Sequence, residues 1–489
     1  MQPPKSETAI KVYLLKYTIK TRGAERKINM KKYDIIIIGA GASGVFLAYE
    51  LTKIKNGATV LMIDKGESLE KRMCPIKTGK VSSCVKCSPC HIMNGYGGAG
   101  TLSDGKYNIT TNFGGDLHKY VGVDEAIDLM EYVDEVLCSM GGADAKLYST
   151  GSGDLKTRAL RNNLHLLDAK VRHLGTDRNV QILGKIFEYT KDRVDMMFRC
   201  GVSDVARSDD GSFTVTTESG EEFSCSDLVL ATGRSGSKWI AEMCRRFGID
   251  QKSNRVDIGV RVELPAEVFR HITDEVYESK IVYKTDKYND MVRTFCMNPY
   301  GEVVAENTNG IVTVNGHSYA DPALRTENTN FALLVSNTFT EPFKNSNEYG
   351  ESIARLSNML GGGVLLQRFG DLVKGRRSSE RRMEKCFTRP TLKATPGDLS
   401  LVIPKRQLDD IIEMIYALDK IAPGTANEDT LLYGVEVKFY NSKVEVDGNL
   451  ETKVKGLYAL GDGSGVTHSL SQASASGVHV ARILAEKYK

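Results

Sequence analysis

A glycine motif set between a strand and a helix constrains this chain more than any other feature. Gly39, Gly41 and Gly44 form a GxGxxG pattern directly after a β-branched run that ends at Ile38, and a helical pattern over Val45–Ile54 follows. In this context the first glycine allows a tight turn, the second lets the backbone approach a pyrophosphate, and the third lets the helix pack closely on the strand. The helix N-terminus would direct free N–H groups and partial positive charge at the phosphates.

An acidic residue in the next predicted strand supports the same interpretation. The strand Thr59–Ile63 ends in Asp64, twenty residues after Gly44. A carboxylate at this position can hold the ribose hydroxyls of a dinucleotide. A glycine-rich turn without a ligand is the competing interpretation, but strand, helix and acid are all present. We therefore expect a dinucleotide site, and the motif alone fits both NAD and FAD.

The far end of the chain distinguishes these two cofactors. Residues 452–462 form a short apolar strand that ends in Gly461 and Asp462 and precedes a helix. This pattern resembles the second flavin signature of the glutathione-reductase-like FAD superfamily, and Thr232-Gly233 resembles the strand end of its ATG motif. The resemblance implies FAD, with Asp462 bonded to the ribityl chain and diphosphate. Because we find no second GxGxxG, any NAD(P)H would donate electrons without a domain of its own.

Length and composition set wider limits. A chain of 489 residues is too long for one ordinary core, and its 41% hydrophobic and 26% charged residues are ordinary for a globular protein. The net charge of +3 comes without an aromatic-interleaved basic tract, so nucleic acid is not an expected partner. No apolar run approaches the roughly eighteen residues of a membrane span, and we expect a cytoplasmic protein.

Four cysteines form a second motif. Cys74, Cys84, Cys87 and Cys90 lie within seventeen residues, and the last three have CxxC spacing. Such thiols could hold a structural zinc ion or a [4Fe–4S] cluster, or they could be free or disulfide-exchanging thiols. The spacing predicts a shared chemistry and leaves these three alternatives open.

A second glycine-rich segment, residues 94–106, follows the cysteines. Its many glycines would let the backbone approach a flat or charged ligand, so we prefer a flavin-lining segment to a flexible surface loop. The stretch GGAGTLSDGK, residues 97–106, resembles a bacterial and archaeal family of uncharacterised NAD(P)/FAD-dependent dehydrogenases. Further similarity lies at 257–263, at 293–304 and at 314–316, so the resemblance covers most of the chain from Met30 onward.

The residues that we expect to contact FAD come from five segments of the chain. They are Gly39, Gly41, Ala42, Ser43, Gly44, Asp64, Lys65, Gly98, Ala99, Gly100, Ser103, Asp104, Thr232, Gly233, Gly461 and Asp462.

Four residues are candidates for catalysis. The family similarity around Cys296 suggests that its thiol faces the flavin, although cysteine is often simply buried. His468 follows the Gly461-Asp462 pair and could protonate a substrate or stabilise reduced flavin, and His317 is the other titratable candidate. Lys106, like Arg293, could bind an anionic substrate, against the alternative of a solvated surface position.

The predicted fold is α/β, a Rossmann-like FAD-binding domain of parallel sheet plus three-stranded β-meander, with an inserted α+β substrate or cap domain. Its parts are a weakly ordered leader 1–29, FAD-binding segments 30–116, 184–252 and 429–489, a mostly helical insertion 117–183 and a cap domain 253–428. The sequence predicts an FAD-dependent oxidoreductase acting on a small organic substrate. The alternatives are an electron-transfer or redox-sensing module that passes electrons to a partner protein and, with less support, an FAD-dependent RNA-modifying enzyme.

Overall fold

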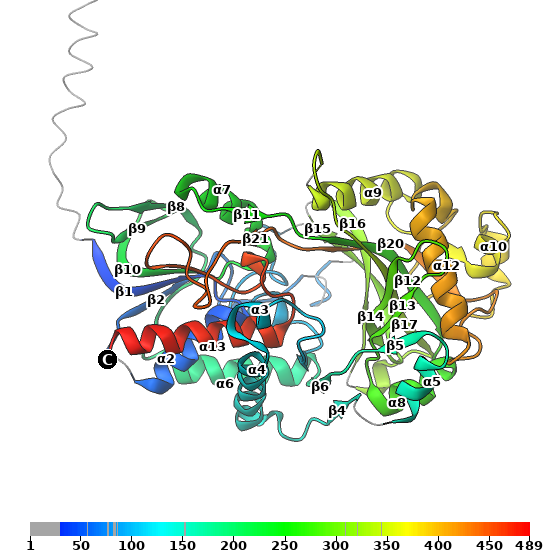
Figure 1. The fold of residues 1–489 in the computed structure, drawn as a ribbon, viewed down its shortest axis with the longest axis horizontal. Coiled ribbons are helices and arrows are strands. Elements are labelled where there is room, and N and C mark those ends of the chain that lie inside the picture. Colours follow the sequence, from blue (N-terminus) through cyan, green and yellow to red (C-terminus); the bar gives the residue numbers. More distant parts are fainter. Residues whose placement is uncertain are drawn as a thin grey trace, which may run out of the picture.

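The computed structural model describes residues 30–55, 57–75, 78–81, 85, 87–150, 153–308, 310–319, 321–343 and 345–489. The predicted leader 1–29 and Cys84 lie outside the described residues. The described chain forms two large sheets, each with its own helices, and these lie side by side (Figure 1).

The first sheet is built around the strand that precedes the glycine motif. Parallel strands run in the order β7-β2-β1-β10-β22, and β9 and β8 extend the sheet from β10 in antiparallel fashion. The bounds are β1 Lys31–Ile38, β2 Val60–Ile63, β7 Asp195–Met197, β8 Val202–Arg207, β9 Phe213–Thr217, β10 Glu222–Leu230 and β22 Leu457–Ala459.

Strand β1 is buried on both faces, as its unbroken apolar run predicts. Ile35 and Ile37 pack into the core beneath the helices α2, α4, α6 and α13, whereas Ile36 and Ile38 pack on the opposite face against α7. Figure 1 shows these helices on either side of the sheet. Their bounds are α2 Ala42–Ile54, α3 His118–Val121, α4 Val123–Leu137, α6 Thr176–Thr190, α7 Ser237–Phe247 and α13 Leu470–Lys487.

The second sheet has eight strands among the described residues, in the order β19-β18-β20-β12-β17-β14-β13-β5. All neighbouring pairs are antiparallel except β18 and β19. The bounds are β5 Leu164–Leu166, β12 Val256–Pro265, β13 Ile281–Lys284, β14 Met291–Asn298, β17 Asn328–Asn337, β18 Leu365–Arg368, β19 Thr395–Pro396 and β20 Leu431–Phe439.

One face of the second sheet is apolar and covered by helices. Val260, Val262 and Leu333 pack in one core with α5, α8 and α12, which lie on the side away from the first sheet (Figure 1). The remaining elements around this sheet are α5 Asp154–Leu160, α8 Ala266–Val276, β15 Glu302–Thr308, β16 Ile311–His317, α9 Ser346–Gly361, α10 Phe369–Val373, α11 Glu380–Glu384 and α12 Lys405–Asp419.

Three small sheets lie outside the large ones among the described residues. They are β3 Lys106–Ile109 with β6 Lys170–His173 and β4 Leu147–Ser149, β11 Gln251–Lys252 with β21 Lys443–Val444, and the pair β15 and β16. The described part of the chain contains no helix with the length and apolar character that a bilayer span requires.

The structure differs from the predicted secondary structure in three places. The mostly helical pattern expected over 117–183 is interrupted by β4, β5 and β6, and β5 pairs with β13 in the second sheet. β7, expected to begin the meander, pairs in parallel with β2, so the meander consists of β8, β9 and β10. The expected return of the chain near Gly434 occurs after Phe439, because β20 pairs with β12. Each difference depends on a long-range strand pairing that carries no local sequence signal.

Candidate functional site

The GxGxxG glycines meet different surroundings. A Cβ added at Gly39 (φ 110°) would lie less than 3.0 Å from the carbonyl oxygen of Ala231, and one at Gly44 would lie equally close to the carbonyl oxygen of Gly39. These two glycines therefore permit close packing of protein on protein. At Gly41 (φ −73°) the nearest atom to an added Cβ is 3.9 Å away. The space beside the Cα of Gly41, at the N-terminus of α2, is therefore open.

Asp64 ties this turn to its neighbours. Its carboxylate accepts hydrogen bonds from the backbone N–H groups of Ala40 (2.9 Å), Gly66 (2.7 Å) and Gly95 (2.9 Å). The side chain therefore fixes the turn after β1 against the second glycine-rich segment. The contact expected between Asp64 and the ribose stays a prediction. The carboxylate oxygens have lone pairs that these three bonds do not use, and these lone pairs could accept hydrogen bonds from ribose hydroxyls.

The second glycine-rich segment lies against the first. The N–H of Gly97 donates to the carbonyl of Ala40 at 2.7 Å, and Gly98 adopts φ 62° with its Cα facing Gly41. Arg72, which the sequence analysis missed, holds the segment by donating to the carbonyls of Tyr96 (2.6 Å) and Gly98 (2.9 Å). Burial lowers the pKa of Arg72 to about 10. A lone arginine in a cysteine-rich loop gave no signal of this role.

The C-terminal motif packs on the first glycine turn. A Cβ at Gly461 would lie less than 3.0 Å from Oγ of Ser43, and one at Gly477 in α13 would lie equally close to the carbonyl oxygen of Ser43. Only glycine permits this approach, so α13 and α2 cross in close contact. Residues more than 400 positions apart in the chain thereby form one surface.

Asp462 lies between this surface and the end of β10. Its carboxylate accepts a hydrogen bond from Thr467 Oγ1 at 3.0 Å and lies 3.9 Å from Nε of Arg234. Burial raises the pKa of Asp462 to about 6, against the opposing charge of Arg234. Nearby, Gly233 (φ 62°) has no atom within 4 Å of an added Cβ, and the buried Thr232 Oγ1 has no hydrogen-bond partner among the described residues.

These segments enclose one cavity of about 490 Å³. It is lined by every predicted FAD contact except Gly44 and Gly461, which pack behind it, and by Cys296, His468 and Lys106 of the catalytic candidates. His317 lies in β16 and is not among the residues that line the cavity, so the structure does not bring it to the other candidates.

The side chain of Lys106 is buried. The alternative of a solvated surface position for Lys106 is therefore wrong. Its side chain is 8% exposed, and Nζ lies 3.0 Å from Asp104 Oδ2 and 3.6 Å from Glu278 Oε2. Nζ also donates to the carbonyl of Met297 at 3.0 Å. Burial alone would lower the pKa of Lys106, but the charges of Asp104 and Glu278 outweigh it and raise the pKa. Lys106 therefore stays charged and links the two halves of the protein.

Cys296 lies in β14 with an unusual backbone. Its φ of 48° falls in the left-handed region, which is uncommon for a residue with a side chain. The carbonyl of Cys296 accepts hydrogen bonds from Arg261 Nη1 (2.8 Å) and Asn298 Nδ2 (2.9 Å), and these bonds hold the strained turn. The thiol is partly exposed and lines the cavity, so it can reach a bound ligand.

His468 lies just before α13, which Ser469 caps by accepting from the N–H of Gln472. The imidazole packs edge-on against Tyr440, with ring centroids 4.6 Å apart. Burial lowers the pKa of His468 to about 3, and the charge of Arg255 adds to the effect. In this structure the ring is neutral near pH 7 and can donate or accept one hydrogen bond in the cavity.

Several residues from the second sheet complete the wall and were missed or underrated from the sequence. Glu278, Lys280, Arg293 and Lys438 come from β13, β14 and β20 or the turns beside them. The family similarity around Arg293 was the only sequence signal for any of these four residues. The side chain of Arg293 is mostly buried, so the alternative of a solvated surface position is wrong for Arg293 too. Their convergence depends on the pairing order of the second sheet.

The cysteine motif borders this cavity at Cys90, whose carbonyl accepts hydrogen bonds from the N–H groups of Met93 and Asn94, two residues of the lining. Cys74, Cys87 and Cys90 are partly exposed free thiols and do not line the cavity. No group of three or more His, Cys, Asp or Glu able to hold a metal occurs among the described residues, from which Cys84 is missing. Zinc and the iron–sulfur cluster thus stay predictions.

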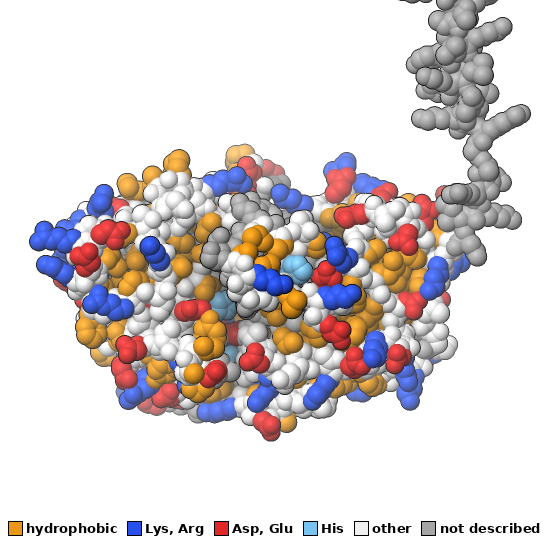
Figure 2. Space-filling model, turned by 180° about the vertical axis from the view of Figure 1, so that it is seen from behind, with side chains coloured by type: hydrophobic (Ala, Val, Ile, Leu, Met, Phe, Trp, Pro, Cys, Tyr) orange, Lys and Arg blue, Asp and Glu red, His pale blue; other side chains and the backbone are white. Residues whose placement is uncertain are grey.

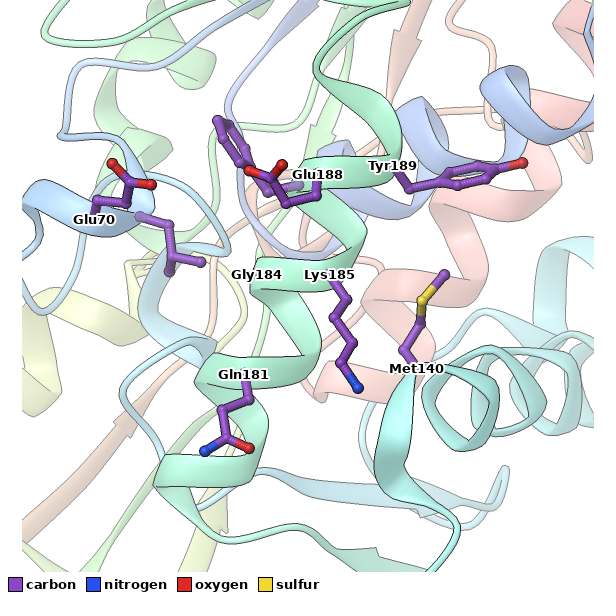
Figure 3. A pocket seen from close by; sticks show the side chains of 9 residues that line it. Glu70, Met140, Gln181, Gly184, Lys185, Glu188 and Tyr189 are labelled. Atoms are coloured by element: carbon purple, nitrogen blue, oxygen red, sulfur yellow. The ribbon is translucent and has the colours of Figure 1, made fainter.

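A second hollow of about 820 Å³ lies on the outside of α6 (Figure 3). Figure 3 shows Gln181, Lys185, Glu188 and Tyr189 projecting from this helix, with Met140 opposite. No residue predicted from the sequence to bind or react lines this hollow. The molecular face in Figure 2 carries basic and acidic side chains interspersed, and the expectation that nucleic acid is not a partner stays a prediction.

Comparison with known proteins gives one domain match and several more distant similarities. Residues 255–439, from just before β12 to the end of β20, match the family described as FAD-dependent protein, C-terminal domain-like. A protein of Clostridium beijerinckii described as uncharacterized is 27% identical over 478 residues, which cover 93% of this chain and 81% of that protein.

Solved structures of low similarity include glycine oxidase from Geobacillus kaustophilus and PqsL of P. aeruginosa in complex with 2-aminobenzoylacetate. The first is 12% identical with a TM-score of 0.40 and covers 94% of this chain and 96% of that one. The second is 11% identical with a TM-score of 0.36 and covers 93% and 86%. The domain match supports FAD as the cofactor of this chain. It begins one residue before β12 and ends with β20, both strands of the second sheet.

Proposed function

We propose that this protein is an FAD-dependent oxidoreductase, with a Rossmann-like FAD-binding domain, that acts on a small organic substrate held between its two sheets. One observation carries the proposal. The glycine turn after β1 and Asp462 at the other end of the chain line the same cavity as Cys296 and Lys280 from the second sheet. A dinucleotide site and a substrate site thus share one space.

The residues present fit an extended dinucleotide. Gly41 leaves open space in front of the first turn of α2. Among the described residues no side chain caps this helix, and its first turn has no acidic residue that would repel a phosphate. At the end of β10, Thr232 Oγ1 has no hydrogen-bond partner among the described residues, and the Cα of Gly233 is open, so this point offers both room and a hydrogen-bonding group. The match of residues 255–439 to an FAD-dependent protein domain supports FAD as this dinucleotide.

FAD, when bound, would supply the ring that accepts or donates hydride. Backbone N–H groups of the α2 N-terminus would bind the diphosphate, and Asp64 would keep that turn in place. Gly461 and Asp462 would bind the ribityl portion. Lys106, held by Asp104 and Glu278, would keep the two halves of the cavity in register. His468, neutral and beside Tyr440, could hold or transfer a proton at one imidazole nitrogen.

Purification of the full chain tests this proposal. We expect yellow protein with flavin absorption bands, one equivalent of FAD released on denaturation, and bleaching of these bands on anaerobic reduction. Chromatography of the released cofactor distinguishes FAD from FMN, and parallel titrations with NADH and NADPH identify a nicotinamide donor. A colourless protein that does not bind added FAD would refute the proposal.

A further inference from the structure

The face of the second sheet that lines the cavity is cationic. Lys280 Nζ, Lys438 Nζ and the guanidinium carbon of Arg293 lie 3.9, 5.0 and 5.4 Å from the ring centroid of Phe295. Arg255 lies 5.0 Å from the ring centroid of Tyr440 on the same wall. Four positive side chains thus surround two aromatic rings that line the cavity.

The neighbouring carboxylates compensate only part of this charge. Glu278 lies 2.9 Å from Lys280 Nζ but also pairs with Lys106, and Asp257 pairs with Arg293 and lies 3.8 Å from Arg255 Nε. Lys438 forms no ion pair within 4 Å with any residue that the structure describes. At longer range its charge acts on the carboxyl groups of Glu436 and Asp462, but these also face Arg261 and Arg234. The wall therefore keeps an excess of positive charge.

Burial makes this arrangement costly for the protein alone. The side chain of Lys280 is 5% exposed, and burial lowers its pKa, with repulsion by Arg293 adding to the effect against the attraction of Glu278. A bound anion would offset this repulsion in a site of low dielectric constant, where charge interactions are strong.

The surroundings of the cations indicate what kind of anion fits. Phe295, Phe113, Phe439 and Tyr440 contribute apolar surface directly beside the charges. Lys280 Nζ lies 4.4 Å from the ring centroid of Phe113, so this ammonium group lies between two aromatic rings. Flat apolar walls next to a concentrated positive charge suit an organic acid with a compact apolar body more than a fully hydrated inorganic ion.

We propose that the substrate of this enzyme is a small organic carboxylate whose charged end binds Lys438 and Lys280 beside Phe295. That this carboxylate is a substrate rests on the proposed function, whereas its binding at this wall does not. In the proposed function the diphosphate of the cofactor would bind elsewhere, at the N-terminus of α2 beside the first sheet. Lys438, without an ion-pair partner among the described residues, is the side chain whose removal tests the inference with least damage to its neighbours.

Isothermal titration calorimetry of the purified full chain with benzoate and with benzamide provides the test. The two probes have nearly the same shape and differ in charge. We expect benzoate to bind at least tenfold more tightly than benzamide, and Lys438→Met to weaken benzoate at least tenfold without weakening benzamide. Lys438→Arg should keep benzoate binding within about threefold of the parent. Thermal melting checks that each variant is folded.

Lys420→Met is the matched control, because Lys420 is an exposed lysine just after α12, on the covered side of the second sheet. It should leave benzoate binding unchanged. Equal affinities for benzoate and benzamide, or equal losses in the Lys438→Met and Lys420→Met variants, would overturn the inference while a flavin spectrum would still support the proposed function. Benzoate binding through Lys438 in a protein that takes up no FAD would contradict the proposed function and leave the carboxylate site supported.

Discussion

Replacing Gly41 by alanine separates a glycine needed for a ligand from a glycine needed for the fold. The backbone at Gly41 has φ −73°, which alanine adopts readily, and an added Cβ would lie no closer than 3.9 Å to another atom. Alanine at a compatible position gains about 0.4–1 kcal/mol through the unfolded chain, and loss of a glycine N-cap costs a comparable amount. The free energy of unfolding of the flavin-free protein should change by less than about 1 kcal/mol.

The same methyl group would occupy the space that the diphosphate of FAD needs. We expect Gly41→Ala to weaken FAD binding at least tenfold, which is about 1.4 kcal/mol. Flavin-free protein is titrated with FAD by following the quenching of flavin fluorescence, and its thermal unfolding is measured separately, because bound FAD would itself raise the melting temperature.

Gly44→Ala provides the contrast. A Cβ at Gly44 would lie less than 3.0 Å from the backbone oxygen of Gly39, and a backbone atom cannot move aside as a flexible side chain can. Overpacking of this kind costs about 1–3 kcal/mol, so the flavin-free variant should melt several degrees lower. If Gly41→Ala binds FAD as the parent does, or destabilises the flavin-free protein as much as Gly44→Ala, the reasoning about this turn is refuted.

Two further predictions concern the partly buried carboxyl group of Asp462 and the cysteines. The pKa of Asp462 is raised to about 6 in the folded protein from an ordinary 3.8, so its stabilising contribution is complete below about pH 4 and is lost as the pH rises through 6. In urea unfolding above pH 7, the free energy of unfolding of the flavin-free Asp462→Asn variant should exceed that of the parent by about 2–3 kcal/mol. This gain should shrink toward pH 4. A gain that does not depend on pH would contradict the raised pKa of Asp462. The double variant Cys87→Ser with Cys90→Ser should keep its FAD content within twofold, because neither thiol lines the cavity, and a colourless variant would show the opposite.

The parts of the site that could be predicted are those whose signal is local in the sequence. Gly39, Gly41 and Gly44 sit between a strand and a helix, and the C-terminal Gly461-Asp462 pair follows a short apolar strand, so each could be recognised without knowledge of the fold. Both ends line or back the same cavity in the structure, and their contacts with FAD stay a prediction.

The residues of the site that could not be predicted are brought together by strand pairing and packing between distant parts of the chain. Arg293 lies in β14 and Lys438 in β20, two strands separated in the sheet by β17 and β12, and only that order brings both side chains to Phe295. Arg72 acts by reaching carbonyl groups more than 20 residues further along the chain. Neither arrangement leaves a pattern in the sequence, since it follows from tertiary packing rather than from spacing or propensity.

The central claim is that both ends of the chain bind one FAD molecule, and a crystal structure of the protein with FAD tests it most directly. The account predicts electron density for one FAD that passes over Gly41 at the α2 N-terminus and reaches Gly461 and Asp462, with its ring facing Cys296 and Lys280. Density that contacts only one of these two ends, or FAD bound outside the cavity, would contradict it.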